Sequence, residues 1–155
     1  MNETDARIAS ALLVADSEQL WQGVLLIRRR VFADEQGLVD LGITDGDDAA
    51  SVTLVAMLGD QPVSTGRLTP PVPGRSAYLS WIATLAEYRG RGIATKLVER
   101  LVATSDSRGY PELQLASQAQ AVGLYAQFGF ERLGRPYVVR GIPHQAMARS
   151  LRIGR

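Results

Sequence analysis

The first part of the chain changes from a short apolar run to apolar residues at helical spacing. Residues 7–15 form the apolar run, which predicts a strand, and Asp16 followed by Gln19 has the spacing of a helix capping box. Apolar residues then recur at helical spacing up to a predicted helix end near Gly37, at Leu20, Val24, Ile27 and Val31. We therefore expect one strand followed by one amphipathic helix.

Three strands are predicted next. Residues 50–58 are rich in aliphatic and β-branched side chains, and residues 61–69 form a similar run after Gly59-Asp60, a dipeptide that suits a two-residue hairpin turn. A proline-rich stretch follows, and residues 78–84 form the third apolar run. These features predict an antiparallel meander of three strands.

The second half of the chain alternates between the two kinds of pattern. Helices are predicted over residues 88–105 and 118–127, with a strand over residues 112–117 between them. Two further strands are predicted over residues 130–133 and 142–151. Because antiparallel strands precede a β-α-β unit, we expect an α/β (α+β) fold with a mixed central sheet flanked by helices.

Length and composition limit the chemistry that is open to the protein. The 155 residues fit a single domain over residues 1–155, and their net charge of +1 gives no sign of a nucleic-acid or membrane partner. The chain has no cysteine, which excludes thiol nucleophiles and disulfides, and its one histidine is His144. We expect no metal site. Without a secretory signal or an apolar stretch of membrane-spanning length, we expect a cytoplasmic protein.

The segment Arg89-Gly90-Arg91-Gly92-Ile93-Ala94 joins a predicted strand to a predicted helix. Its glycines allow a ligand to approach the backbone, and the first turn of a helix offers unpaired N–H groups and a positive dipole end. Together with the two arginines, these features predict an anion site of the kind that holds a pyrophosphate. The segment lacks the Gly-Lys-Ser/Thr of a nucleotide P-loop and the third glycine of a dinucleotide fingerprint. The alternative interpretation is a helix start with arginines that face solvent.

Two motifs resemble the GNAT N-acetyltransferase superfamily. The sequence YRGRGIATKLVERL is similar to the acyl-CoA pyrophosphate loop of that family, whose pattern Arg/Gln-x-x-Gly-x-Gly/Ala is met by Arg89, Gly92 and Ala94. The sequence LYAQFGF, residues 124–130, resembles the second family element, a helix with a tyrosine followed by an aromatic-Gly-Phe turn. The two motifs also have the separation and the predicted context that the family shows.

The ends of the sequence resemble one branch of this superfamily, the ElaA-like branch. The N-terminal likeness lies in Arg30-Val31-Phe32, Glu35-Gln36, Asp45, Asp47 and Asp48, and the C-terminal likeness in Gly141-Ile142-Pro143-His144 and Met147-Ala148-Arg149. The resemblance covers roughly residues 20–150. It implies the GNAT acyl-CoA N-acyltransferase fold, with a sheet of six to seven strands.

The resemblance also implies an activity and a binding mode. The expected reaction is direct transfer of an acetyl group from acetyl-CoA to a primary amine of a small molecule or peptide, through a ternary complex. The pantetheine arm would pair with the strand that precedes the loop, and a β-bulge would open a slot there. The resemblance assigns cofactor contacts to Ile82, Ala83, Thr84, Arg89, Gly90, Arg91, Gly92, Ile93, Ala94 and Tyr125.

The catalytic groups follow from the same resemblance. Tyr125 is the expected general acid for the CoA thiolate, and the alternative is a tyrosine that only packs in the core. The amine proton could pass to His144, to Glu35, or through water to Asp45; alternatively, the histidine is structural and the glutamate braces the first helix. One family contact is missing, because Gly123 stands where relatives often carry an asparagine that touches CoA.

Residues 34–48 hold six of the 16 acidic residues and are predicted to form a loop near the acceptor entrance. Such a loop would favour cationic acceptors, unless its acidic groups only balance the arginines. Two other functions stay open: a non-catalytic acyl-CoA-binding or sensing domain, and an acyl-homoserine-lactone synthase. A homodimer is also compatible with the sequence, which does not identify the acceptor.

Overall fold

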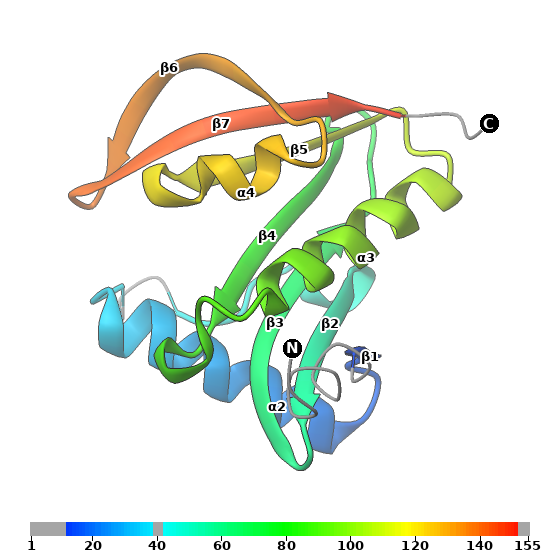
Figure 1. Cartoon of the computed structure of the whole chain (residues 1–155). Helices are drawn as coiled ribbons and strands as arrows, with labels where there is room; N and C mark the ends of the chain where they lie inside the picture. Colours follow the sequence, from blue (N-terminus) through cyan, green and yellow to red (C-terminus); the bar gives the residue numbers. More distant parts are fainter. Residues whose placement is uncertain (1–11, 39–41, 152–155) are drawn as a thin grey trace.

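The computed structural model describes residues 12–38 and 42–151, and Figure 1 shows how the strands and helices are arranged. Seven strands form one sheet in the order β1-β2-β3-β4-β5-β7-β6. The strands are β1 Leu12–Val14, β2 Val52–Leu58, β3 Gln61–Thr69, β4 Ala77–Thr84, β5 Glu112–Gln118, β6 Glu131–Val139 and β7 Ile142–Ser150. Strands β4 and β5 are parallel, and the other neighbouring pairs are antiparallel. The mixed sheet that the sequence predicts is therefore confirmed.

The helices are short apart from two. The α-helices are α2 Glu18–Arg28, α3 Ile93–Ser107 and α4 Val122–Ala126; a π-helix, Arg29–Glu35, continues α2; and three short 3-10 turns are Asp48–Ala50, Ala86–Tyr88 and Ala119–Ala121. Within the described residues, no helix combines the length and the apolar character needed to cross a membrane.

The two long helices cover opposite faces of the sheet. Val24 and Ile27 of α2 pack in one cluster with Val55 of β2, whereas Leu97 of α3 packs in another cluster with Leu54. Because neighbouring residues of a strand point to opposite faces, Leu54 and Val55 place the two helices on opposite sides. The apolar interior is thus divided into two layers by the sheet.

Gly66 of β3 allows α3 to lie close to the sheet. A Cβ atom at this position would be 2.6 Å from Ile82 Cδ1, 2.6 Å from Leu97 Cδ2 and 3.0 Å from Leu101 Cδ1. The three side chains fill the space that a larger residue would need. Gly66 therefore sets the spacing between α3, β3 and β4.

The first helix differs from its prediction at both ends. The N-cap is Ser17, whose Oγ accepts a hydrogen bond of 3.2 Å from Leu20 N, so the prediction of Asp16 as the N-cap is wrong. At the other end the helix continues to Glu35 as a π-helix, and Gln36 N donates to Val31 O five residues earlier at 3.1 Å. The predicted end near Gly37 is thus reached, although by a wider helical turn.

The terminal strands also differ from prediction. Residues Leu12–Val14 of the first predicted strand form β1, and residues 7–11 lie outside the described part of the chain. The predicted strand over residues 130–133 is too short, because β6 extends over Glu131–Val139. All nine residues of β6 are exposed, so buried and exposed positions do not alternate along this strand. The register with β7 shifts after Leu133.

The two later helices begin after their predicted starts. Residues Ala86–Tyr88 form a 3-10 turn, and α3 begins at Ile93 because Gly90 and Gly92 both have positive φ angles, of 77° and 79°. The helix predicted over residues 118–127 divides into a 3-10 turn and the five-residue α4. Both changes place loop backbone, rather than helix, beside the cleft described next.

Candidate functional site

Strands β4 and β5 pair at one end and separate at the other. Their parallel register covers three pairs, the last of which is Leu79 with Leu115, and Figure 1 shows the two strands diverging beyond it. A cleft of about 610 Å³ lies between them. Its lining takes residues 79–84 from β4, together with Leu115, Ala116 and Gln118 from β5. The β4 backbone in the cleft is therefore an unpaired strand edge on the β5 side.

A β-bulge in β4 marks the point of separation. Arg67 of β3 pairs with Ser80, and Thr65 pairs with Ala83, so Trp81 and the next residue of β4 stand opposite Gly66 alone. Trp81 has a φ angle of +56°, in the left-handed region that non-glycine residues rarely adopt. A conformation of this kind costs about 1–3 kcal/mol and persists where surrounding contacts enforce it. The bulge expected from the family resemblance is present.

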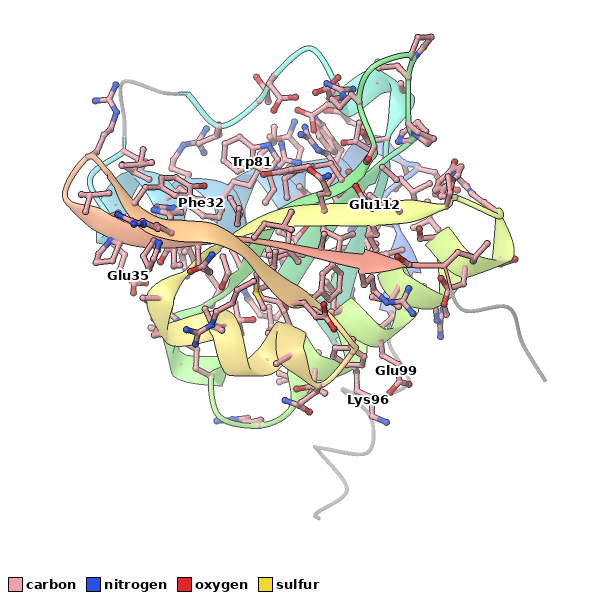
Figure 2. All side chains as sticks on the ribbon, turned by 90° about the horizontal axis from the view of Figure 1, so that it is seen from above. Phe32, Glu35, Trp81, Lys96, Glu99 and Glu112 are labelled. Atoms are coloured by element: carbon pink, nitrogen blue, oxygen red, sulfur yellow. The ribbon has the colours of Figure 1, made fainter. Side chains whose placement is uncertain are left out.

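Three contacts hold the Trp81 side chain. Its indole Nε1 donates a hydrogen bond of 3.2 Å to Asp45 Oδ2. The guanidinium carbon of Arg28 lies 4.6 Å from the ring centroid, and the Phe32 ring meets the indole at 5.1 Å in an edge-to-face contact. Figure 2 shows Trp81 and Phe32 lying close together. Trp81 and Phe32 both line the cleft, so this anchored pair forms part of its wall.

Two buried arginines support the acidic loop beneath Trp81. Arg28 is fully buried, binds both carboxylate oxygens of Asp48 at 3.0 and 3.1 Å, and donates to Ile43 O at 2.9 Å. Arg67 donates to Asp45 and, at 3.0 Å, to Asp48. Arg67 Nε also donates to Ser80 Oγ at 3.0 Å. One ionic network therefore joins α2, the loop, β3 and β4.

This network changes the interpretation of the acidic loop. Burial raises the pKa of Asp45, but hydrogen bonds from Arg67, from Trp81 and from the Asp47 backbone outweigh it and lower the pKa to about 2. Asp47 pairs with Arg75 at 3.2 Å, and Asp48 pairs with the two buried arginines. Three loop carboxylates thus neutralise arginines of the same chain, as the alternative interpretation held. Asp45, with so low a pKa, is a poor acceptor for an amine proton.

The glycine-rich loop has the geometry of an anion site. Gly92 is the N-cap of α3 in a left-handed conformation, and no side chain caps the first turn. A Cβ atom at Gly90 or Gly92 would meet nothing within 4 Å, so the space beside this backbone is open. Gly92, Ile93, Ala94 and Thr95 all line the cleft. The free N–H groups of the first turn therefore lie at the cleft, where an anion would be stabilised.

The two arginines of the loop are held by neighbouring groups. Arg89 binds both oxygens of Glu35, at 2.6 and 2.7 Å, and its Nε donates to Thr84 O at 2.9 Å. Arg91 lies over the Tyr88 ring, with its guanidinium carbon 5.3 Å from the centroid. The hydrogen bonds from Arg89 lower the pKa of Glu35, which makes this carboxylate a weaker base. Its position fits the alternative role, a brace between the π-helix and the loop.

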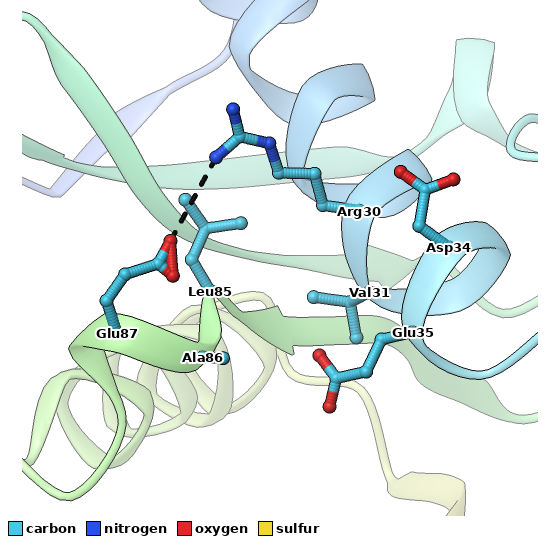
Figure 3. Close-up of a pocket in the computed structure, with 7 residues that line it drawn as sticks. All are labelled: Arg30, Val31, Asp34, Glu35, Leu85, Ala86 and Glu87. Atoms are coloured by element: carbon cyan, nitrogen blue, oxygen red, sulfur yellow. Dashed lines mark ion pairs between the residues drawn. The ribbon is translucent and has the colours of Figure 1, made fainter.

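A second, smaller cavity adjoins the first on the far side of this brace. It has a volume of about 380 Å³ and is lined by the seven residues drawn in Figure 3. Arg30 and Glu87 face each other across it, with 4.0 Å between their charged groups. Val31 and Glu35 thus belong to the walls of both cavities.

Tyr125 and His144 line the same cleft from two different elements. Tyr125 lies on α4 and is buried, with its ring edge-to-face against Phe130 at 6.0 Å. Burial raises the pKa of its phenol well above the ordinary value, so the hydroxyl keeps its proton at neutral pH. The protonated phenol can donate to a developing negative charge, and the raised pKa makes it a weaker acid than an exposed tyrosine.

The surroundings of His144 select one tautomer. Its Nδ1 lies 2.8 Å from Ile142 O, and its ring stacks on Tyr137 with 5.8 Å between centroids. Since a carbonyl oxygen only accepts hydrogen bonds, the neutral ring carries its proton on Nδ1 and a lone pair on Nε2. In that tautomer the acceptor nitrogen of His144 is Nε2, and the residue lines the cleft.

Some residues of the cleft were missed by sequence reasoning. Gln36 and Gln118 exchange side-chain hydrogen bonds of 3.0 and 3.3 Å, which join the end of the π-helix to the end of β5. The hydrogen bond between Asp45 and Trp81 was likewise not predicted. No local pattern signals contacts between residues so far apart in sequence. Gly123, which stands where relatives often carry an asparagine, lies on α4 with open space around its Cα, so a larger side chain would fit there.

A sheet split between two parallel strands, with a bulge on one of them and an open glycine loop at a helix start, defines the class of CoA-dependent acyltransferases. Residues 44–151 match the family described as the acetyltransferase (GNAT) domain. The chain belongs to this family, and the resemblance inferred from its motifs is confirmed. In the described residues, no three His, Asp or Glu side chains gather as metal ligands.

Relatives agree with this assignment. A UPF0039 protein of Synechocystis is 35% identical over 128 residues, which cover 80% of this chain and 82% of the relative. An acyl-CoA N-acyltransferase of Pseudomonas aeruginosa is similar in fold, with a TM-score of 0.80 and 24% identity over 90% of this chain and 98% of its own. Escherichia coli ElaA has the same TM-score of 0.80 at 23% identity, over 90% and 97% of the two chains. The last two likenesses establish the GNAT fold.

Proposed function

We propose that this protein is an acetyl-CoA-dependent N-acetyltransferase that moves the acetyl group directly to a primary amine. The observation that carries the proposal is a single cleft, which brings together the open glycine loop, the free edge of β4, Tyr125 and His144. These are the parts that binding of an acyl-CoA and transfer of its acyl group require. We further propose that residues 1–155 act as one domain in the cytoplasm.

Acyl-CoA would bind along two backbone surfaces. The N–H groups at the start of α3 suit the pyrophosphate, since they are uncapped and lie beside two glycines. The pantetheine arm suits the β4 edge over Ile82, Ala83 and Thr84, where β5 no longer pairs. Because Thr84 O already accepts from Arg89, and Ala83 O accepts from Ser64 Oγ of β3 at 3.0 Å, the main chain of Ile82 is the better partner.

The chemistry needs two proton transfers. A neutral amine attacks the thioester carbonyl, and the bond between that carbon and the CoA sulfur breaks as thiolate leaves. Tyr125 donates its phenolic proton to the thiolate, and His144 Nε2 takes the proton that the amine loses. The chain has no cysteine to carry an acetyl group, which agrees with direct transfer in a ternary complex. Holding the two reactants together in the cleft supplies much of the rate.

Release of CoA thiol across a panel of amines tests this function. Because the protein has no cysteine, a thiol reagent reports CoA without a background signal from the enzyme. We expect release that depends on both acetyl-CoA and one class of amine. Binding of acetyl-CoA without such release would identify a binding or sensing domain instead. A stronger thermal shift with long-chain acyl-CoA than with acetyl-CoA would favour the acyl-homoserine-lactone synthase alternative.

A further inference from the structure

We propose that Asp45 is a positioning residue for acyl-CoA: by holding the indole of Trp81, it keeps the β4 bulge in the shape that opens the cleft. The inference rests on the proposed function, because it treats the cleft as the acyl-CoA site. Asp45 acts through Trp81 and through the strand that carries it. Among the described residues, the hydrogen bonds of Asp45 reach neither the glycine-rich loop nor Tyr125 or His144.

The bulge depends on an anchor because its backbone is strained. Trp81 has a φ angle of +56°, which β-carbon sterics disfavour for any residue except glycine. Contacts of the Trp81 side chain help to hold this conformation, and the hydrogen bond that its indole donates goes to Asp45. Arg28 and Phe32 pack on the ring, but neither fixes the direction of the N–H group as a hydrogen bond does.

Asp45 itself is fixed to the strand opposite the bulge. Its other carboxylate oxygen accepts from Arg67, the neighbour of Gly66, and from the Asp47 backbone N–H at 2.9 Å. Arg67 also holds Ser80, the residue before Trp81. The carboxylate therefore connects β3 and β4 on the two sides of the bulge. On the cleft side, the pairing of β4 with β5 ends at Leu79, before the bulge.

Loss of this anchor should close or deform the cleft. If Trp81 relaxes to an ordinary strand conformation, the bulge is no longer enforced and β4 shifts toward regular pairing. The main chain at Ile82 would then move away from the position that suits pantetheine. The expected result is weaker binding of acyl-CoA, with a smaller effect on turnover once acyl-CoA is saturating.

The substitution Asp45→Asn tests the anchor without a change in shape. An asparagine has one acceptor oxygen, so it can satisfy Arg67 or Trp81 but must turn its amide N–H₂ toward the other donor. We expect the Kd for acetyl-CoA, measured by calorimetry, to rise about tenfold, the change that corresponds to loss of one charge-assisted hydrogen bond. The KM for acetyl-CoA should rise with the Kd, and kcat should change less.

Asp47→Asn is the matched control. Asp47 belongs to the same loop and also pairs with an arginine, but its partner Arg75 is exposed and neither residue lines the cleft. This variant should bind acetyl-CoA as the wild type does. An equal loss in both variants would point to a general effect of loop charge and would overturn the inference.

The substitution Trp81→Gly tests whether Asp45 acts through Trp81 or only stabilises the protein in general. Glycine adopts positive φ freely, so residue 81 then needs no anchor. In this background, Asp45→Asn should change the Kd for acetyl-CoA by less than about twofold, because the two positions are coupled. A second full tenfold loss would show that Asp45 acts independently of Trp81, against the proposal.

Trp81→Phe keeps the test decisive if Asp45→Asn does not fold. It removes the indole N–H and leaves the Asp45–Arg67 pair in place, and it should weaken acetyl-CoA binding to a similar extent. If Trp81→Phe and Asp45→Asn both bind acetyl-CoA with the wild-type Kd, the inference is wrong. If the wild type itself fails to bind acetyl-CoA, the proposed function is wrong instead.

Discussion

At the scale of single residues, burial and hydrogen bonds set the chemical form of three side chains, Tyr125 and His144 in the cleft and Asp45, which bonds Trp81 of the cleft wall. Tyr125 is held neutral by burial, and Asp45 is held charged by its hydrogen bonds. His144 is held in one tautomer by a backbone carbonyl, with Nε2 left to accept a proton. The proposed roles of Tyr125 as acid and His144 as base rest on these environments.

Tyr125→Phe tests the assignment of the general acid. Removal of the hydroxyl should lower kcat by about 10- to 100-fold, because proximity within the ternary complex preserves part of the rate. The Kd for acetyl-CoA should hardly change. Tyr110→Phe, which alters a tyrosine outside the cleft, is the control and should keep full activity. Unchanged turnover in Tyr125→Phe would remove this residue from the mechanism.

The ionic network beneath Trp81 predicts a specific acid sensitivity. The pKa of Asp45 is about 2 in the folded protein and 3.8 ordinarily, so its charged form favours folding. This contribution is fully present above about pH 4 and is lost as the pH falls toward 2. Urea unfolding at a series of pH values should therefore show a steeper loss of stability in this range for the wild type than for Asp45→Asn. Parallel profiles for the two proteins would contradict the network.

At the scale of elements, the cleft exists because β4 is paired differently along its two halves. Its first half is held between β3 and β5, and its second half bulges opposite Gly66 and leaves β5. The helix α3 packs on the other side of that bulge through Leu97 and Leu101, which surround Gly66. The helix that follows the glycine-rich loop thus packs on β3 at Gly66, directly opposite the bulge that opens the cleft.

Gly66→Ala tests this packing, and Gly123→Ala is its matched control. The new methyl group at position 66 would collide with three side chains and should lower the free energy of unfolding by about 1–3 kcal/mol. At position 123 the space is open and the residue is helical, so alanine should raise stability by up to about 1 kcal/mol. Chemical denaturation measures both. Equal effects at the two positions would show that the close approach of α3 is not required.

At the scale of the whole molecule, the parts of the fold with local signals were predictable. The meander, its Gly59-Asp60 turn and the glycine loop follow from patterns within a few residues. The extent of β6 was not predictable, because all of its residues are exposed and no alternation marks it. Likewise, the Gln36–Gln118 pair joins positions 82 residues apart, and the Asp45–Trp81 bond joins positions 36 apart. Such contacts are determined by topology, which a local pattern does not contain.

The central claim is that the split between β4 and β5 is the acyl-CoA site. A crystal structure of the protein with CoA tests it most directly. We predict pyrophosphate on the N–H groups at the start of α3, pantetheine along the β4 edge at Ile82, and the sulfur near Tyr125. CoA bound elsewhere on the surface, with this cleft filled only by solvent, would contradict the account.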